Sequence, residues 1–157
     1  MHTRTPHWTF GPCECFSEEL ATWWRLHAPV VDEWLSEMEA AGDPWWPSAE
    51  HAAFCLVSYQ ESQAQMEGRS PSWDRFDVAD FLFHDLHEGG TVAFFGSVRI
   101  FFDHLVEALR RFAGAGLLDA DQARAWLAKL ESAREDFIRY YEHPTDVDAP
   151  FAPGRQT

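Results

Sequence analysis

Residues 91–144 read TVAFFGSVRIFFDHLVEALRRFAGAGLLDADQARAWLAKLESAREDFIRYYEHP, and this stretch decides the fold. Its apolar side chains recur every three to four positions, the spacing of one face of an α-helix. Before the Gly-Ala-Gly at 114–116 the stripe contains Val92, Phe95, Val98, Phe102, Leu105, Leu109 and Phe112. After it the stripe contains Ala123, Trp126, Leu127, Leu130, Phe137, Ile138 and Tyr141. We therefore expect two long helices joined by a glycine turn into a hairpin, the second ending before Pro144.

Polar residues within the same stretch predict where the second helix begins and which face of the first helix is exposed to solvent. Asp119 and Gln122 have the spacing of a variant capping box, which favours a helix start at this point. Arg99 lies four residues before Asp103, and Glu107 lies four residues before Arg111. This spacing predicts ion pairs within the first helix, on a face exposed to solvent.

The residues upstream predict three more helices, over 17–42, 48–68 and 75–88. A serine that can cap the helix begins each of the first two, and a glycine ends each of them. Pro29 interrupts the first, where it either kinks one helix or separates two. The third is expected to bury one apolar side, formed by Phe76, Ala79, Phe83 and Leu86.

These elements predict an all-α, single-domain bundle of five to six mostly antiparallel helices over residues 17–143. No segment alternates as a strand does, and none carries an Asn-Gly hairpin. Residues 1–16 lack periodicity and are expected to form an extended, irregular arm that Trp8 and Phe10 anchor. Residues 144–157 are expected to form a short, mobile tail.

The charge of the chain is strongly negative and unevenly distributed. Of the formal net charge of −14, residues 1–90 contribute sixteen acidic side chains against four arginines. Residues 91–157 carry ten acidic against eight basic side chains. The acidic half would repel nucleic acid and anionic lipid, so we expect neither as a direct partner, whereas a basic protein would be attracted.

The apolar stretches and the cysteines indicate the compartment. The richest stretch, residues 92–102, is shorter than the roughly 18 residues of a membrane helix, and the N-terminus lacks the apolar region of a signal peptide. Three cysteines do not make a disulfide framework. We therefore expect a cytoplasmic chain with reduced thiols. Cys55 is expected in the core. Cys13 and Cys15 are expected either to be free thiols in the arm or to form a mixed zinc site with a histidine.

A candidate metal site lies in FDVADFLFHDLHEGG, residues 76–90. Asp77, Asp80, His84 and His87 follow one another at spacings of three, four and three, which places them on one helical face. Asp80, His84 and His87 could hold Zn or Fe, with Asp80 as a ligand or as a group that orients a histidine. The favoured alternative is the solvated face of an amphipathic helix, and in that case no cofactor is expected.

Tryptophan is abundant in the first half of the chain, with adjacent pairs at 23–24 and 45–46. Two adjacent residues of a helix do not point the same way, so we expect one of each pair to be partly exposed or covered by the arm. Exposed tryptophans are frequent binding hot spots. The predicted partner-binding residues are Trp23, Trp24, Trp45, Trp46 and Trp73. The alternative for residues 45–46 is that they fasten their loop to the bundle.

Together these features favour a non-enzymatic, acidic helical module that binds a protein through an aromatic and acidic surface. An adaptor, an inhibitor or immunity-type protein and a regulator all fit. The chain has no Walker loop, dinucleotide fingerprint or nucleophile elbow. Two alternatives stay open: a metal-binding protein or metal-dependent enzyme using Asp80, His84 and His87, and a small-molecule-binding bundle with a Trp- and Phe-lined pocket. A homodimer is compatible with all three.

Overall fold

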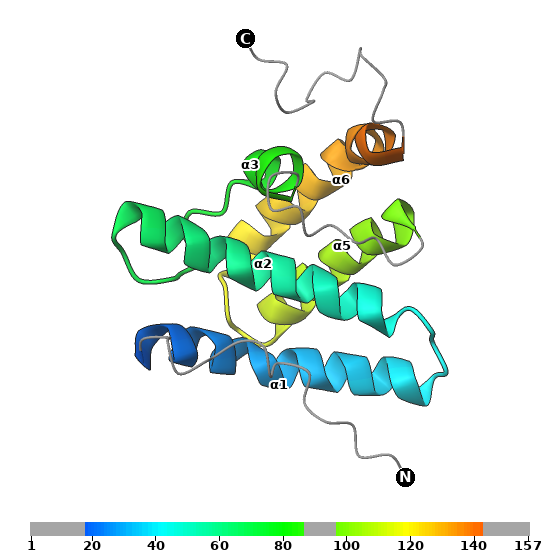
Figure 1. Cartoon of the computed structure of the whole chain (residues 1–157), viewed down its shortest axis with the longest axis horizontal. Helices are drawn as coiled ribbons and strands as arrows, with labels where there is room; N and C mark the ends of the chain where they lie inside the picture. Colours follow the sequence, from blue (N-terminus) through cyan, green and yellow to red (C-terminus); the bar gives the residue numbers. More distant parts are fainter. Residues whose placement is uncertain (1–17, 87–96, 143–157) are drawn as a thin grey trace.

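The computed structural model describes residues 18–86 and 97–142, and within them the chain is helical and has no strand (Figure 1). The helices are α1 (Glu18–Ala40), α2 (Trp46–Glu67), α3 (Val78–Asp80), η2 (Phe81–Asp85), α5 (Val98–Gly114) and α6 (Ala120–Glu142). Helix η2 follows α3 directly and has the wider π-type turn, so the two form one helical segment. The predicted all-α bundle is confirmed. The predicted arm and tail lie outside the described residues.

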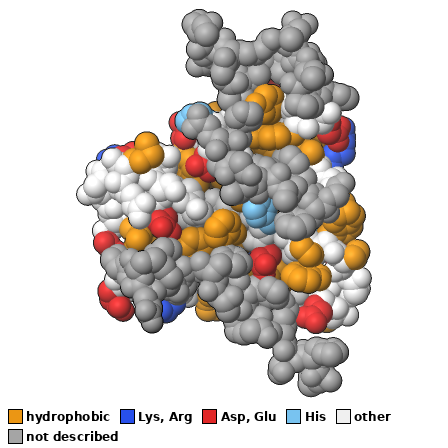
Figure 2. Space-filling model, viewed as in Figure 1, with side chains coloured by type: hydrophobic (Ala, Val, Ile, Leu, Met, Phe, Trp, Pro, Cys, Tyr) orange, Lys and Arg blue, Asp and Glu red, His pale blue; other side chains and the backbone are white. Residues whose placement is uncertain are grey.

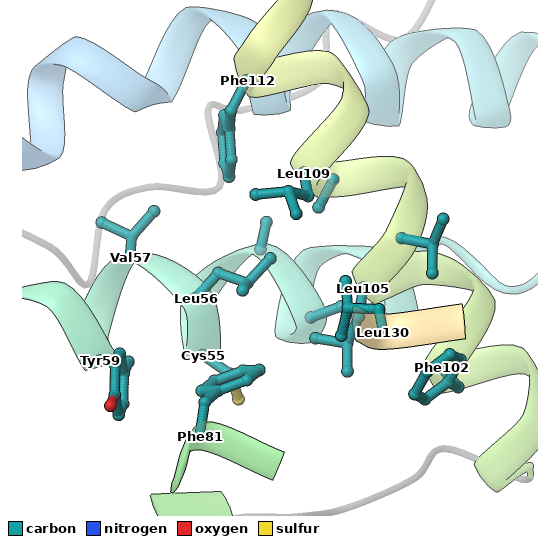
Figure 3. Close-up of a cluster of buried hydrophobic side chains, with 14 of the residues drawn as sticks. Cys55, Leu56, Val57, Tyr59, Phe81, Phe102, Leu105, Leu109, Phe112 and Leu130 are labelled. Atoms are coloured by element: carbon teal, nitrogen blue, oxygen red, sulfur yellow. The ribbon is translucent and has the colours of Figure 1, made fainter. Parts of the chain in front are cut away.

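Helix α5 is the centre of the bundle, because it packs against α1, α2 and α6. Helices α1 and α2 run antiparallel, side by side, and α3 packs against α6 (Figure 1). Side chains of α2, η2, α5 and α6 meet in the core, which Figure 3 shows around Leu56, Phe81, Leu105 and Leu130. A single hydrophobic cluster includes residues from every one of these helices.

The predicted hairpin of the two last helices is confirmed. Every described member of the predicted α5 stripe is buried, namely Val98, Phe102, Leu105, Leu109 and Phe112. Val92 and Phe95 lie outside the described residues. On α6, Ala123, Trp126, Leu130, Phe137 and Ile138 are buried, and Leu127 and Tyr141 are half-buried. The carboxylate of Asp119 accepts a hydrogen bond from the backbone N–H of Gln122 (3.0 Å), as the predicted cap requires.

The surface ion pairs of α5 agree only in part with the prediction. Glu107 and Arg111 form the expected pair within the helix (2.9 Å). The predicted pair of Arg99 with Asp103 is wrong, because both residues find partners on α6. Asp103 pairs with Arg134 (3.0 Å), and Arg99 pairs with Glu142 (3.4 Å). The antiparallel packing of α6 thus converts local pairs into links between helices.

The predicted N-cap role of Ser48 is also wrong. Helix α2 begins two residues earlier, with Pro47 in its first turn, where a missing N–H costs nothing. The carboxylate of Asp43 accepts a hydrogen bond from the backbone N–H of Trp45 (2.8 Å) and so organises the approach to the helix. Ser48 is therefore inside the helix and buried, and its hydroxyl bonds to the ring of His104 (2.9 Å).

The third predicted helix starts later than expected, and three of the four side chains of its predicted apolar side are buried, namely Phe76, Phe83 and Leu86. Asp77 is the N-cap, with extended backbone, and its carboxylate accepts from the N–H of Asp80 (3.0 Å). Phe76 is buried but precedes the helix. The helical register therefore starts at Val78, which is buried, and Ala79 is exposed rather than buried as predicted.

Pro29 does not divide the first helix, since α1 is continuous from Glu18 to Ala40. A proline has no N–H for the carbonyl one turn earlier, here that of Arg25. Both Arg25 and Pro29 face solvent, where water can satisfy that carbonyl. The position of the proline on the outer face thus explains why the helix tolerates it.

The turn between α5 and α6 requires a left-handed residue. Gly116 has φ +78°, its N–H donates to the carbonyl of Ala113 (3.0 Å), and the N–H of Leu117 donates to that of Phe112 (3.0 Å). This pair of bonds is the Schellman arrangement that closes a helix C-terminus. Gly114, two residues earlier, is still helical.

We predict that Gly116→Ala lowers the free energy of unfolding by about 1 kcal/mol, because only glycine adopts this φ without strain. Gly114→Ala is the matched control and should raise it by about 0.5 kcal/mol, since alanine favours the helix. A Cβ at either position would meet no atom within 4 Å, so sterics do not enter. Urea unfolding measures both; equal effects of one sign would contradict the assignment of the turn.

Candidate functional site

Asp80 contacts two residues, Tyr59 and His84, on the predicted metal-binding face. The Tyr59 hydroxyl donates to Asp80 Oδ2 (2.8 Å), and Asp80 Oδ1 lies 3.2 Å from His84 Nδ1. This second contact is an ion pair only when the His84 ring is protonated. The structure thus joins two of the predicted ligands and adds Tyr59, which the sequence did not indicate.

Solvent exposure increases from Tyr59 through Asp80 to His84. Tyr59 is 2% exposed, whereas the side chains of Asp80 and His84 are 36% and 56% exposed. Burial, the hydrogen bond to Asp80 and nearby acidic charge all raise the pKa of Tyr59, so it stays a donor at neutral pH. Each Asp80 oxygen already contacts a neighbouring side chain, which suits a group that orients His84 better than a direct ligand.

The metal prediction itself stays a prediction. His87 lies outside the described residues, and within the described ranges no three His, Cys, Asp or Glu side chains group in a way that could hold a metal ion. On other helices, Glu61 and His104 form hydrogen bonds within the bundle. Glu61 accepts a hydrogen bond from Trp24 (2.5 Å), and His104 bonds to Ser48.

Cys55 has the core position that was expected of it. It is buried, and its sulfur lies 3.6 Å from Nε2 of His51, one turn earlier on α2. Burial, helped by the charge of Asp85, raises the pKa of the Cys55 thiol to about 12. A thiol at neutral pH is a poor nucleophile, so this pair does not have the electrostatics of a catalytic Cys–His dyad. Cys13 and Cys15 lie outside the described residues.

A buried histidine organises the tryptophans of the first half. The indole N–H of Trp73 donates to His27 Nε2 (3.0 Å), and His27 Nδ1 lies 2.8 Å from the carbonyl of Trp23. An indole only donates and a carbonyl only accepts, so the ring is neutral with its proton on Nδ1. Burial lowers the pKa of His27 to about 4. The spacing of residues along the chain gives no sign of this bond.

Three of the predicted partner-binding tryptophans lie in the core. Trp23, Trp24 and Trp73 are 7%, 3% and 3% exposed. Trp23 and Trp24 are both buried because each indole N–H reaches α2, at the carbonyl of Val57 (3.1 Å) and at Glu61. Neither indole is therefore exposed, and the arm that was expected to cover one of them lies outside the described residues. A partner role for these three tryptophans stays a prediction.

The other two, Trp45 and Trp46, are half-buried. Both pack against the edge of the core at the start of α2. They therefore fasten this end of the helix and still present part of their surface to solvent. The two alternatives from the sequence, a fastening role and a binding role, are compatible at this position.

Three surface hollows bear on the small-molecule alternative. Their volumes are about 300, 260 and 440 Å³. Among the described residues, the first includes one tryptophan, Trp23, the second one phenylalanine, Phe83, and the third no aromatic side chain. None of the three therefore has a wall lined by Trp and Phe, and the aromatic pocket stays a prediction.

We predict that His27 makes stability depend on pH in a defined window. Its pKa is lowered on folding from 6.5 to about 4, so its contribution is complete above pH 6.5 and is lost as the pH falls toward 4. The loss should reach about 3 kcal/mol. Urea unfolding between pH 4 and 7 should show a shallower dependence for His27→Gln than for the wild type. His84→Gln, at the surface, is the control, and an unchanged slope in His27→Gln would refute the prediction.

Comparison with known proteins places no constraint on this site. No protein-family model, curated protein or solved structure matches the chain. Among the described helices, none combines the length and apolar character needed to cross a membrane.

Proposed function

We propose that this chain is a non-enzymatic, acidic helical module that binds a basic protein partner. The observation that carries the proposal is the surplus of acidic over basic side chains in residues 18–86. Residues 18–86 contain fourteen acidic side chains and three arginines. On the face drawn in Figure 2, acidic side chains cover more of the described surface than Lys and Arg do. Such a surface attracts positive charge and speeds the encounter with a basic partner.

The three arginines of this part neutralise little of that charge. Arg69 and Arg75 both pair with Glu67 (2.6 and 3.0 Å), and Arg25 pairs with Glu18 (3.6 Å). Other carboxylates have no ion pair within the described residues and are exposed, namely Glu19, Glu33 and Asp74. The negative potential is therefore available to a partner.

The aromatic part of the proposed surface is the start of α2. Trp45 and Trp46 are half-buried there, and Glu39 and Asp43 precede them in the chain. Tryptophans that are fixed by packing and partly exposed lose little conformational freedom on binding. We call these four residues the tryptophan surface. Its composition suits a partner with apolar side chains among its positive charges.

A metal-binding function is a second candidate, which the 3.2 Å contact between Asp80 Oδ1 and His84 Nδ1 favours. A carboxylate on Nδ1 is the usual way in which proteins orient a metal-binding histidine. Equilibrium dialysis against Zn²⁺ tests it, with His84→Ala expected to lose the bound ion and His104→Ala expected to keep it. Absence of binding to the wild type would exclude this candidate.

We expect the immobilised full-length chain to capture one basic protein in stoichiometric amount from lysate of its native cell. Trp45→Ala with Trp46→Ala should reduce capture about tenfold, and raising the salt from about 0.05 to about 0.3 M should weaken it. Met66→Ala is the control, because Met66 is 79% exposed and roughly 30 Å away along α2. Circular dichroism verifies that the variants fold. The proposal fails if nothing is captured, or if all variants capture equally.

A further inference from the structure

A second surface feature lies at the opposite end of α1 from the tryptophan surface. It is a hollow of about 300 Å³ between the first turns of α1 and the loop that follows α2. Its lining residues are Glu18, Glu19, Thr22, Trp23, Leu26 and Pro71. We call it the α1 hollow.

The floor of the α1 hollow is apolar. Leu26 is 49% exposed, and among the described residues only Met66 is a comparably exposed large apolar side chain. Trp23 lies beside it with its indole N–H bonded to the carbonyl of Val57, so the ring does not need to be ordered on binding. Pro71 adds a rigid apolar group from the loop. A preformed apolar floor of this kind loses little entropy when it is covered.

The rim of the α1 hollow is acidic. Glu18 and Glu19 lie in the first turn of α1, and both are exposed. Glu18 forms an ion pair with Arg25 at 3.6 Å. Both side chains are exposed, and an ion pair at the surface contributes little free energy. Glu19 has no ion pair within the described residues. A cation that approaches the hollow would therefore meet two accessible carboxylates.

The other two hollows lack this combination of an apolar floor and charge of one sign. The hollow beside η2 contains both Lys129 and Asp136. The hollow between α1 and α5 contains Glu33 and Glu107 as well as Arg110 and Arg111. Mixed charge gives no preference for a basic or an acidic ligand. Of these three hollows, the described lining residues give charge of one sign only to the α1 hollow.

We infer that the α1 hollow is a docking site for a basic segment of a partner protein, with one apolar side chain in the hollow and Lys or Arg facing Glu18 and Glu19. The inference rests on the proposed function and specifies a second contact for the same kind of partner. The volume is at the lower limit of the roughly 300–1,000 Å³ typical of small-molecule pockets, which suits one or two side chains. Acidic segments and anionic lipid are disfavoured by charge.

The test uses the full-length chain and a helical peptide of about 14 residues with a leucine stripe and lysines elsewhere. Two comparison peptides replace all leucines by glutamine or all lysines by glutamate. Fluorescence anisotropy should show that the Leu–Lys peptide binds at least about tenfold more tightly than either. Leu26→Ser should weaken its binding about tenfold and Glu18→Gln with Glu19→Gln several-fold, whereas Met66→Ser should not change it.

Several results would overturn the inference. Binding that Met66→Ser weakens as much as Leu26→Ser does would indicate non-specific contact. Binding that Leu26→Ser leaves unchanged would place basic segments elsewhere, and the proposed function would then survive without this site. A concentration-dependent dimer in light scattering that Leu26→Ser abolishes would identify a second copy as the occupant. Failure of the peptide to bind would reject the α1 hollow alone, because capture through the tryptophan surface is tested independently.

Discussion

The hydrogen bond from Trp73 to His27 is the interaction on which the packing of the first half depends. It joins a non-helical segment to the middle of α1, at a buried position where an unpaired polar group would be costly. Trp73 also lies against Phe112 of α5 and Trp126 of α6, with ring centroids 5.7 and 6.5 Å away. One indole therefore contacts three helices, and its N–H fixes its orientation. The segment between α2 and α3 is placed by this residue.

At the edges of the bundle, charged side chains also connect one helix to another. Arg111 on α5 pairs with Glu37 of α1 (2.7 Å) and lies over the ring of Trp34 (5.4 Å). Arg134 on α6 pairs with Asp103 of α5 and lies over Phe102 (5.8 Å). Both arginines are thus used in contacts between helices. In the first half, the exposed carboxylates of Glu19, Glu33 and Asp74 have no ion pair within the described residues, and we assign their charge to an external partner.

The two proposed contacts give the halves of the chain different roles. The hairpin of α5 and α6 supplies the centre of the core, and α1 with α2 carries the outward-facing acidic and aromatic groups. The tryptophan surface and the α1 hollow lie at opposite ends of α1, a helix of 23 residues, or roughly 35 Å. A partner long enough to reach both would gain from their linkage, since the second contact becomes intramolecular.

The sequence by itself determined the all-α class, the α5–α6 hairpin, the glycine helix ends and the core position of Cys55, because periodicity and local capping depend only on neighbours in the chain. Predictions from the sequence failed where a residue from a distant part of the chain competes with the local partner for a hydrogen bond or an ion pair. Ser48 bonds to His104 instead of capping, and Asp103 pairs with Arg134 instead of Arg99. Only the tertiary structure decided that Trp23 and Trp24 are both buried and that Asp80 connects Tyr59 to His84. These outcomes depend on which helix packs alongside, and spacing along one helix carries no information about that.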